Sequence, residues 1–303
     1  MTQPVGAAIH RILVPLDGSQ LAEEILPYAI EIARRAGAEV LLLTAIQPVG
    51  IWNATASAIN WEQEEKSAQD YLDAVAQRLT ADGLRVRTQR EHGDAGGAVL
   101  RAAEEADARM VAMTTHGRSG IGRWLFGSVA DRIIQSANVP LLVIRVAEDR
   151  EPRPVDFQKI LVPLDGSEVA SSIVPLIEDF ARLFGASLVL YHAVSPIAAY
   201  PGFETVYPPM TGDALEEMQK QARELLSRAA GHIQAGGLTA TTAVSIDSAA
   251  DGILNAASST GAGLIAIGTH GRSGLGRAVM GSVANDVLRR ATLPCLLLHP
   301  REA

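Results

Sequence analysis

Two runs of glycine, arginine and serine in this sequence have the residue types that bind an anion. They read THGRSGIGRWLFGS over residues 115–128 and THGRSGLGRAVMGS over residues 269–282. Glycines let a backbone approach a ligand closely and adopt positive φ angles, while Arg118 and Arg123 bring positive charge to the first copy. Each run ends in Gly-Ser before an amphipathic segment, where the free N–H groups of a helix start suit a phosphate. The runs therefore predict phosphate-binding loops, with a flexible connection carrying solvated arginines as the alternative.

An aspartate follows the same apolar run in both halves of the chain. The letters ILVPLDGS occur over residues 12–19 and again over residues 160–167, so Asp17 and Asp165 come just after a predicted strand. A carboxylate in that position can accept hydrogen bonds from ribose hydroxyls or from an adenine amino group. Alternatively, Asp-Gly-Ser makes a turn and caps the next helix. Because the glycine run is expected at the same sheet edge, we favour ligand binding.

The two motifs recur in the same order, which indicates a duplicated domain. The ILVPLDGS copies are 148 positions apart and the glycine runs 154, so the second half has gained six residues between them. We expect this insertion in the proline- and aromatic-rich stretch at 195–209, which is typical of an irregular loop. A chain of 303 residues holds about two domains. We expect them at 1–147 and 157–303, joined by a polar linker that contains two prolines.

Short apolar runs alternate with longer amphipathic ones in each half. We expect strands at residues 11–16, 39–46, 84–91, 109–115 and 140–146, and at 159–164, 187–194, 238–245, 263–269 and 295–299. In the first half we expect helices at 21–36, 61–81, 95–106 and 128–137, the last of them capped by Ser128. This order predicts an α/β fold of two tandem doubly wound domains, each a five-stranded parallel sheet with helices on both faces. Ligands bind such sheets beyond the carboxyl ends of the strands, at the point where the strand order reverses and where both motifs are expected.

The composition indicates a soluble globular protein and argues against some partners. Hydrophobic residues make up 48% and charged residues 20%, and the net charge of −8 is unfavourable for a broad nucleic-acid surface. Cys295 is the single cysteine, so we expect no disulfide, a buried strand position for this residue and a reducing cytoplasm. We expect no secretory signal and no membrane partner, because no apolar run reaches the ~20 residues that cross a bilayer. No cluster of cysteine and histidine predicts a metal site.

With these motifs, the chain resembles a tandem universal stress protein over residues 9–146 and 158–299. Nucleotide-binding members of that family carry Gly-x-x-Gly, nine further residues, and then Gly-Ser or Gly-Thr. The second half has this whole pattern from Gly268 to Ser282, whereas the first half begins it with Thr114. The resemblance implies an adenine nucleotide α-hydrolase-like fold, a pseudo-two-fold relation between the domains, and ATP binding in one or both. We expect the second site to bind better, because the Cβ and hydroxyl of Thr114 crowd the ribose-phosphate turn.

The resemblance also implies which residues contact the nucleotide. At the adenine and ribose end they are Pro15, Leu16, Asp17 and Ala45 in the first half, and Pro163, Leu164, Asp165 and Ala193 in the second. Around the phosphates they are Thr114, His116, Gly117, Arg118, Gly127, Ser128 and Val129, and then Gly268, His270, Gly271, Arg272, Gly281, Ser282 and Val283. A Gly-x-Pro-Ala turn that the family often has after the third strand is replaced by GDAG at 93–96 and DSAA at 247–250. Any Mg²⁺ would enter on the phosphates.

These features predict a nucleotide-binding stress protein that senses or sequesters ATP. No Walker lysine follows the glycines and no residue stands out as a water-activating base, so we expect no catalytic residue and at most a weak ATPase. One alternative is a protein-interaction module that docks a partner through the loop at 195–209. Another is a relative of the electron-transfer flavoproteins, which share the fold.

The resemblance further implies that the domains pair within one chain through their fifth strands. These strands lie at 141–146 and 295–299. Pairing would cover two apolar sheet edges that are otherwise exposed. A homodimer is a further assembly that the resemblance allows.

Overall fold

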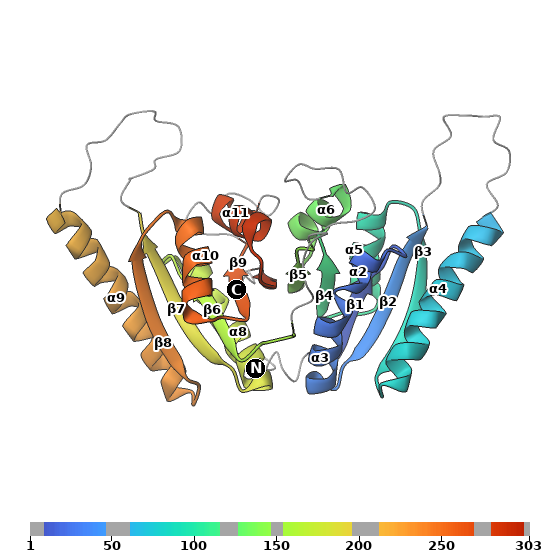
Figure 1. The fold of residues 1–303 in the computed structure, drawn as a ribbon, viewed down its shortest axis with the longest axis horizontal. Helices are drawn as coiled ribbons and strands as arrows, with labels where there is room; N and C mark the ends of the chain where they lie inside the picture. The colour runs from blue at the N-terminus through green and yellow to red at the C-terminus, as the bar shows by residue number, and fades with distance from the viewer. Residues whose placement is uncertain are drawn as a thin grey trace. The chain divides into compact units, whose positions relative to one another are not determined.

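The computed structural model describes residues 9–46, 61–115, 127–146, 154–195, 212–269 and 280–299. The chain divides into two compact units, with the boundary between Val155 and Asp156. Figure 1 draws the helices and strands of both units, coloured along the chain. Each unit is described by itself, and the pairing of the fifth strands stays a prediction.

The first unit alternates strands and helices along the chain. Its elements are β1 (Arg11–Pro15), α2 (Gln20–Glu23), α3 (Leu26–Ala36), β2 (Glu39–Ile46), α4 (Trp61–Ala81), β3 (Arg85–His92), α5 (Ala95–Glu105), β4 (Met110–Thr114), α6 (Ser128–Ser136) and β5 (Leu141–Ile144). The strand order is β3-β2-β1-β4-β5, and every neighbouring pair is parallel.

The second unit repeats this arrangement. Its elements are β6 (Lys159–Pro163), α7 (Glu168–Ser172), α8 (Val174–Phe184), β7 (Ser187–Val194), α9 (Gly212–Ala235), β8 (Ala240–Ile246), α10 (Ala249–Thr260), β9 (Leu264–Gly268), α11 (Ser282–Arg290) and β10 (Cys295–Leu298). The strand order is β8-β7-β6-β9-β10, again with parallel neighbours. The predicted α/β class and the doubly wound parallel sheets are confirmed.

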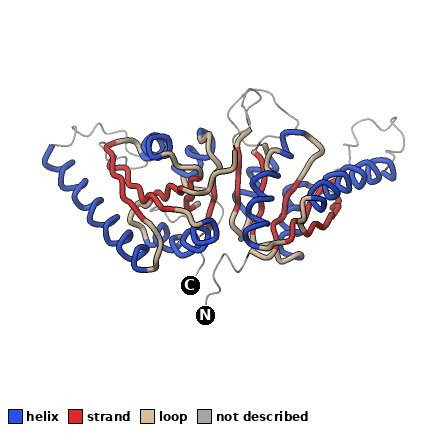
Figure 2. Tube along the Cα trace, turned by 60° about the horizontal axis from the view of Figure 1, so that its bottom comes forward, coloured by secondary structure: helices blue, strands red, loops and turns tan. Residues whose placement is uncertain are grey.

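Helices cover both faces of each sheet, as Figure 2 shows for the blue helices beside the red strands. In the first unit the chain moves from β1 outward to β2 and β3, and then crosses back to β4 and β5. Crossover connections between parallel strands are right-handed, so reversing the direction puts α5 and α6 on the face opposite α3 and α4. The contact between α5 and α6 agrees with this arrangement. The direction changes between β1 and β4, which are hydrogen-bonded neighbours.

Burial differs between the strands of each sheet. The sequence RILVP of β1 has its three middle residues buried, and all residues of β5 and β10 are buried. The strand β3, RVRTQREH, lies at the sheet edge and has no fully buried residue. A polar edge strand is a common device against unwanted strand pairing. The apolar core therefore lies around the inner strands, whose ends carry the predicted site.

The single helix expected at 21–36 is wrong. The chain forms α2 and α3 instead, with Ile25 between them in the αR region as the N-cap of α3. Pro27 stands at the start of α3, where its missing N–H costs no helix hydrogen bond. The same break precedes α8, where Pro175 follows Ile173. A proline in the middle of a long apolar-periodic stretch thus starts a new helix rather than continuing the first.

Candidate functional site

The predicted site residues gather at the carboxyl edge of each sheet. Strand β1 ends at Pro15 and its neighbour β4 ends at Thr114, on the two sides of the point where the chain reverses direction. In the second unit β6 ends at Pro163 and β9 at Gly268, and these strands are also neighbours. Such a reversal leaves a crevice beyond the strand ends, because the helices leave in opposite directions.

Each strand-one aspartate holds a serine that caps the next helix. Asp17 Oδ1 accepts hydrogen bonds from the Ser19 backbone N at 2.9 Å and from Ser19 Oγ at 2.6 Å. Ser19 Oγ in turn accepts from the backbone N of Ala22 in α2. The same arrangement, with the same two distances, joins Asp165 to Ser167 before α7. Asp-Gly-Ser therefore does make a turn and cap the next helix, which fixes the carboxylate at the sheet edge, while ligand binding by Asp17 and Asp165 stays a prediction.

The backbone just before each aspartate is tied to the second strand in two different ways. The Leu16 backbone N donates to the Leu43 carbonyl, and the Leu16 carbonyl accepts from Thr44 Oγ1 at 3.0 Å. In the second unit the Leu164 carbonyl bonds to His192 Nδ1 at 2.6 Å. Since a carbonyl oxygen only accepts, Nδ1 of this imidazole carries a proton. Leu16 and Leu164 are buried beside these contacts, while Pro15, Pro163, Ala45 and Ala193 are half-buried.

The helix that follows each glycine run begins with a glycine cap. Gly127 is the N-cap of α6 and Gly281 is the N-cap of α11, and neither helix has a side-chain hydrogen bond at its cap. The expectation that Ser128 caps α6 is wrong, because Ser128 is already the first helical residue. A glycine N-cap leaves the N–H groups of the first turn without a side-chain acceptor. These amides, which include those of Val129 and Val283, suit an anion.

The starts of α6 and α11 differ in charge and in their hydrogen bonding to the preceding strand. Asp131 stands in the first turn of α6, whereas the first turn of α11 has no acidic residue. Position Asn285 in α11 matches Asp131, since each backbone N donates to its own glycine cap at 3.0 Å. In the second unit the Gly281 backbone N also donates to the Thr269 carbonyl at 2.7 Å. This bond holds the start of α11 against the end of β9.

Some predicted residues lie outside the described ranges. They are His116, Gly117 and Arg118 in the first glycine run, and His270, Gly271 and Arg272 in the second. Most of the loop at 195–209 also lies outside them. The described part of each site therefore consists of the strand ends and the helix start.

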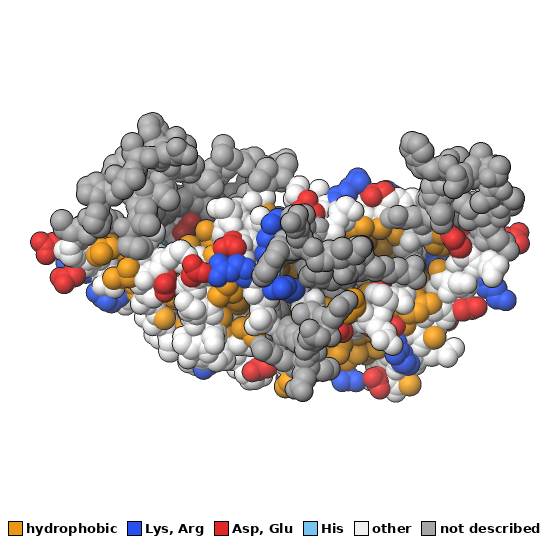
Figure 3. Space-filling view, turned by 45° about the horizontal axis from the view of Figure 1, so that its top comes forward, with side chains coloured by type: hydrophobic (Ala, Val, Ile, Leu, Met, Phe, Trp, Pro, Cys, Tyr) orange, Lys and Arg blue, Asp and Glu red, His pale blue; other side chains and the backbone are white. Residues whose placement is uncertain are grey.

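Ion pairs join the two helices that pack on each other in each unit. In the first unit, Arg132 of α6 pairs with Asp94, the N-cap of α5, at 2.5 Å. In the second, Arg290 of α11 pairs with Asp251 of α10 and, at 3.1 Å, with Asp286. Figure 3 shows basic and acidic side chains interspersed on the face that it draws. The Arg132–Asp94 and Arg290–Asp251 pairs hold α6 and α11, whose first amides lie at the predicted sites, against the neighbouring helices α5 and α10.

A cluster that the sequence motifs did not reveal lies between α2 and α4 of the first unit. Glu23 pairs with Arg78 at 2.5 Å, which joins the two helices. The hydroxyl of Tyr71 is buried, and among the described residues it has no partner in hydrogen-bonding geometry. Burial, followed by the nearby Glu23 carboxylate and by the charge of Asp17, raises the pKa of Tyr71. The phenol therefore stays neutral close to the strand-one aspartate.

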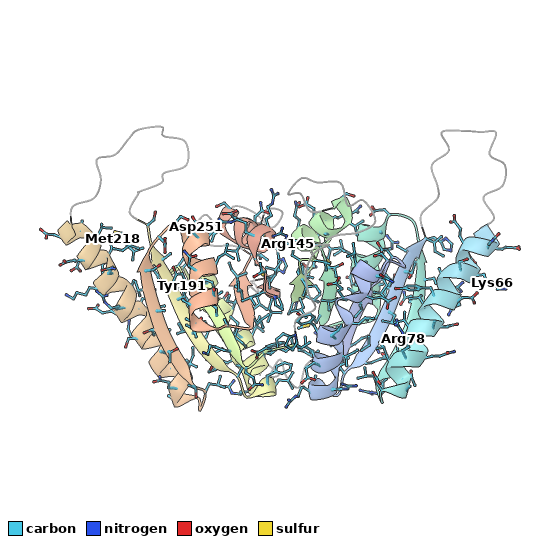
Figure 4. The ribbon with its side chains drawn as sticks, viewed as in Figure 1. Lys66, Arg78, Arg145, Tyr191, Met218 and Asp251 are labelled. Atoms are coloured by element: carbon cyan, nitrogen blue, oxygen red, sulfur yellow. The ribbon has the colours of Figure 1, made fainter. Side chains whose placement is uncertain are left out.

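A second missed cluster lies at the edge of the second sheet. The hydroxyl of Tyr191 in β7 bonds to Ser245 Oγ at 2.6 Å, and Ser245 Oγ donates to Asp247 Oδ2 at 3.2 Å. Figure 4 labels Tyr191 on this strand. Burial is the main cause that raises the pKa of Tyr191. A Cβ on Gly252 of α10 would lie 2.1 Å from the Tyr191 hydroxyl, so this glycine makes room for the phenol.

The sequence profile of the universal stress protein family matches the chain twice, over residues 8–145 and 156–299. The chain belongs to this family. It is a universal stress protein with two family domains in tandem, as the repeated motifs predicted. None of the helices in the described ranges has the length and hydropathy needed to cross a bilayer.

Some relatives and solved structures are similar to this universal stress protein over nearly its whole length, and others over less than half of it. A universal stress protein of Mycolicibacterium smegmatis is 25% identical over 303 residues, which cover 97% of this chain and 99% of the relative. Universal stress protein MJ0531 of Methanocaldococcus jannaschii is 30% identical over 138 residues, 45% of this chain and 81% of that protein. A crystal structure of a universal stress protein from Archaeoglobus fulgidus is similar with a TM-score of 0.72 at 20% identity, covering 97% of this chain and 99% of that one.

Proposed function

We propose that each unit of this universal stress protein binds an adenine nucleotide, ATP in the first instance, at the carboxyl edge of its sheet. Bound nucleotide would let the protein sense or sequester ATP in the cytoplasm during a stress response. One observation carries the proposal. A glycine-capped helix start and a strand-one carboxylate occur in the same unit, next to the point where the chain reverses direction.

The chemistry of these groups fits the two ends of a nucleotide. Gly127 and Gly281 have no side chain that could cap their helices, so among the described residues no cap side chain accepts from the first helix amides, and a phosphate oxygen would supply an acceptor. Asp17 receives its two serine hydrogen bonds at Oδ1. Because a carboxylate has about four acceptor positions, Asp17 keeps the capacity to accept from ribose hydroxyls. Any Mg²⁺ would be held by the phosphates.

The second unit is the better site in this proposal. It has Gly268 in place of Thr114 and the whole glycine pattern of the nucleotide-binding branch. Its helix start also lacks the acidic side chain that Asp131 brings to the first turn of α6. A carboxylate in the first turn repels a phosphate at the same amides, although it favours the helix itself.

The proposal includes no efficient ATP hydrolysis. The glycine runs contain arginine but no lysine, so the phosphate-contacting Walker lysine of P-loop enzymes has no counterpart in them. Arg118 and Arg272, by resemblance, would contribute charge toward the phosphates. Bound ATP would then persist, and its presence rather than its turnover would carry the signal.

Calorimetric titration of ATP into the full chain tests the proposal. Asp165→Asn keeps an oxygen that can accept from Ser167 but removes the charge, so we expect the second site to weaken about tenfold. Asp17→Asn should weaken the first site, while Asp73→Asn on the exposed side of α4 is the matched control and should change neither. Failure of the wild-type chain to bind ATP would contradict the proposal. Phosphate release at rates of about 1 s⁻¹ or faster would contradict its statement on hydrolysis.

A further inference from the structure

A chain of two hydrogen bonds, in which every hydroxyl donates toward the carboxylate, joins the side chains of Tyr191, Ser245 and Asp247. Ser245 Oγ is close to both other groups, at 2.6 Å from the Tyr191 hydroxyl and 3.2 Å from Asp247 Oδ2. The carboxylate only accepts, so the single hydroxyl proton of Ser245 goes to Asp247. Ser245 Oγ must then accept from Tyr191. The phenol and the serine together hold the carboxylate in one orientation.

This chain ends at the part of the site where the base is expected. Ser245 is the register partner of Ala193, which the resemblance assigns to the adenine end. The Asp247 backbone N donates to the Val194 carbonyl at 3.1 Å, so Asp247 lies just beyond the end of β7. Asp247 is also the first residue of DSAA, the stretch that replaces the family's turn after the third strand.

Asp247 has a different electrostatic environment from the acidic residue at the matching edge of the first unit. There Glu91 is the register partner of Ala45, and Arg101 lies 3.7 Å from its carboxylate. In the part of the chain that the structure describes, Asp247 has no basic side chain within ion-pair distance. Asp247 is half-buried as a residue, and its carboxylate accepts from a hydroxyl. Such a group is stabilised by a further donor, because a partly buried carboxylate loses hydration without gaining a cation.

We propose that Asp247 is a specificity-determining residue of the second nucleotide site, where its carboxylate accepts a hydrogen bond from an amino group of the base. Tyr191 and Ser245 are positioning residues for this carboxylate. The 6-amino group of adenine is a donor, whereas the 6-oxo group of hypoxanthine is an acceptor that a carboxylate repels. The second site therefore selects ATP over inosine triphosphate. The first unit has Gly93 at this position and selects less strongly. This inference rests on the proposed nucleotide binding.

Titration of ATP and of inosine triphosphate into the full chain tests the inference. The second site is the one that weakens in Asp165→Asn. We expect its dissociation constant for inosine triphosphate to exceed that for ATP by about ten- to a hundredfold, the range of a hydrogen bond to a charged group. Asp247→Asn presents an amide that donates as well as accepts, so the ratio should fall to within a few-fold of one. Glu91→Gln is the matched control and should leave the ratio at the second site unchanged.

Ser245→Ala is a second variant, which frees Asp247 without removing its charge, and the ratio should fall part of the way. Thermal unfolding followed by circular dichroism verifies that each variant is folded. An unchanged ratio in Asp247→Asn, with ATP still bound, would overturn the inference and leave the proposed function standing. An equal loss of affinity for both nucleotides would also overturn it, because that result indicates only a structural role. If the wild-type chain bound neither nucleotide, the inference and the proposed function would both fall.

Discussion

Single residues distinguish the two copies of the site, although their motifs are shared. Thr114 ends β4 where Gly268 ends β9, and α6 has Asp131 where α11 has Asn285. The first difference adds bulk beside the expected ribose-phosphate turn, and the second adds negative charge at the helix start. If the proposed nucleotide site is correct, both differences would weaken binding in the first unit. The two proposed sites can therefore be compared within one chain, and each serves as the control for variants of the other.

Exchanging Thr114 and Gly268 should exchange part of the affinity. Thr114→Gly should tighten ATP binding in the first unit, and Gly268→Thr should weaken it in the second, each by about tenfold for about 1.4 kcal/mol of crowding. Both positions lie in strands, whose backbone accepts threonine readily. Calorimetric titration of the two variants measures both sites. If each variant bound ATP at the changed site with the same affinity as the wild type, side-chain bulk at this position would not affect binding.

Removing a buried tyrosine hydroxyl should change the free energy of unfolding differently at two positions, 191 and 71. Tyr191 donates to Ser245, so Tyr191→Phe should lower the free energy of unfolding by about 1–2 kcal/mol. Within the described ranges the Tyr71 hydroxyl lies near the Glu23 carboxylate but outside hydrogen-bonding geometry, so Tyr71→Phe should change stability by less than about 0.5 kcal/mol. Urea unfolding of both variants beside the wild type measures the difference. A larger loss in Tyr71→Phe than in Tyr191→Phe would contradict the assignment of these contacts.

The repeated motifs drew attention to residues that lie at the carboxyl edge of each sheet, whereas contacts that depend on strand register were not predicted. Asp17 and Asp165 were singled out from the repeated motif, whereas the caps of α6 and α11 proved to be Gly127 and Gly281 rather than the serine that follows. Tyr191 and Ser245 are 54 positions apart, and nothing local indicates that they meet. A signal was present, because the second half has a glycine at 252 where the first half has an alanine at 98. A glycine inside a helix that its repeat fills with alanine indicates a close neighbour.

At the scale of elements, apolar periodicity predicted the strands well and failed where a local break competes with it. Strands β2 and β7 and helix α4 have the expected bounds. The helix expected at 21–36 divides because the proline at 27 favours the start of a helix. The spacing of the apolar residues fits one long helix as well as two short ones, so it did not predict the break. The serine expected to cap α6 is displaced by the glycine before it. Periodicity records which face is buried, but it does not record where a helix begins.

One basic residue at the start of each central strand ties a helix end to the sheet. Arg11 in β1 donates to the Ala106 carbonyl after α5 and pairs with Glu39 at 2.6 Å. Lys159 in β6 donates to the Thr260 carbonyl at the end of α10 at 2.7 Å. A cation at a helix C-terminus also interacts favourably with the helix dipole. These contacts position the amino ends of the strands, opposite the predicted site.

Removing the basic group should cost more in the first unit. Arg11→Met leaves the largely buried Glu39 without its cation, so we expect a loss of about 2–3 kcal/mol in the free energy of unfolding. Lys159→Met leaves only a carbonyl, since Ser187 takes the position of Glu39, and should cost about 1 kcal/mol. Scanning calorimetry of each variant gives the comparison. A greater loss in Lys159→Met would refute the proposed role of the carboxylate.

At the scale of the whole molecule, duplication was the strongest signal in the sequence. Two motifs in the same order predicted two units, and the alternation of strands and helices then predicted their class. The strand order of both units agrees with the doubly wound arrangement. What duplication could not predict is how far the units have diverged. That divergence lies in side chains such as Thr44 and His192, which make the same backbone contact by different chemistry.

Stability of the whole chain should fall in alkaline solution partly because of its one cysteine. Burial raises the pKa of the Cys295 thiol from 9.0 to about 12. Above pH 9 the unfolded chain releases this proton while the folded chain keeps it, so the thiol's contribution is complete below pH 9 and is lost toward pH 12. Relative to Cys295→Ala, the wild type should lose up to about 1.4 kcal/mol per pH unit in this window. Urea unfolding of both proteins from pH 8 to 10.5 measures the difference, and a constant difference would contradict the expectation.

The space beside Gly252 restricts which elements can be exchanged between the two units. A tyrosine at 191 facing an alanine at 252 would clash, since a Cβ there lies 2.1 Å from the hydroxyl. Anyone who builds chimaeras by grafting β7 into the first unit must therefore transfer α10 with it. This engineering rule has one cause, a hydroxyl that fills the place of a methyl group.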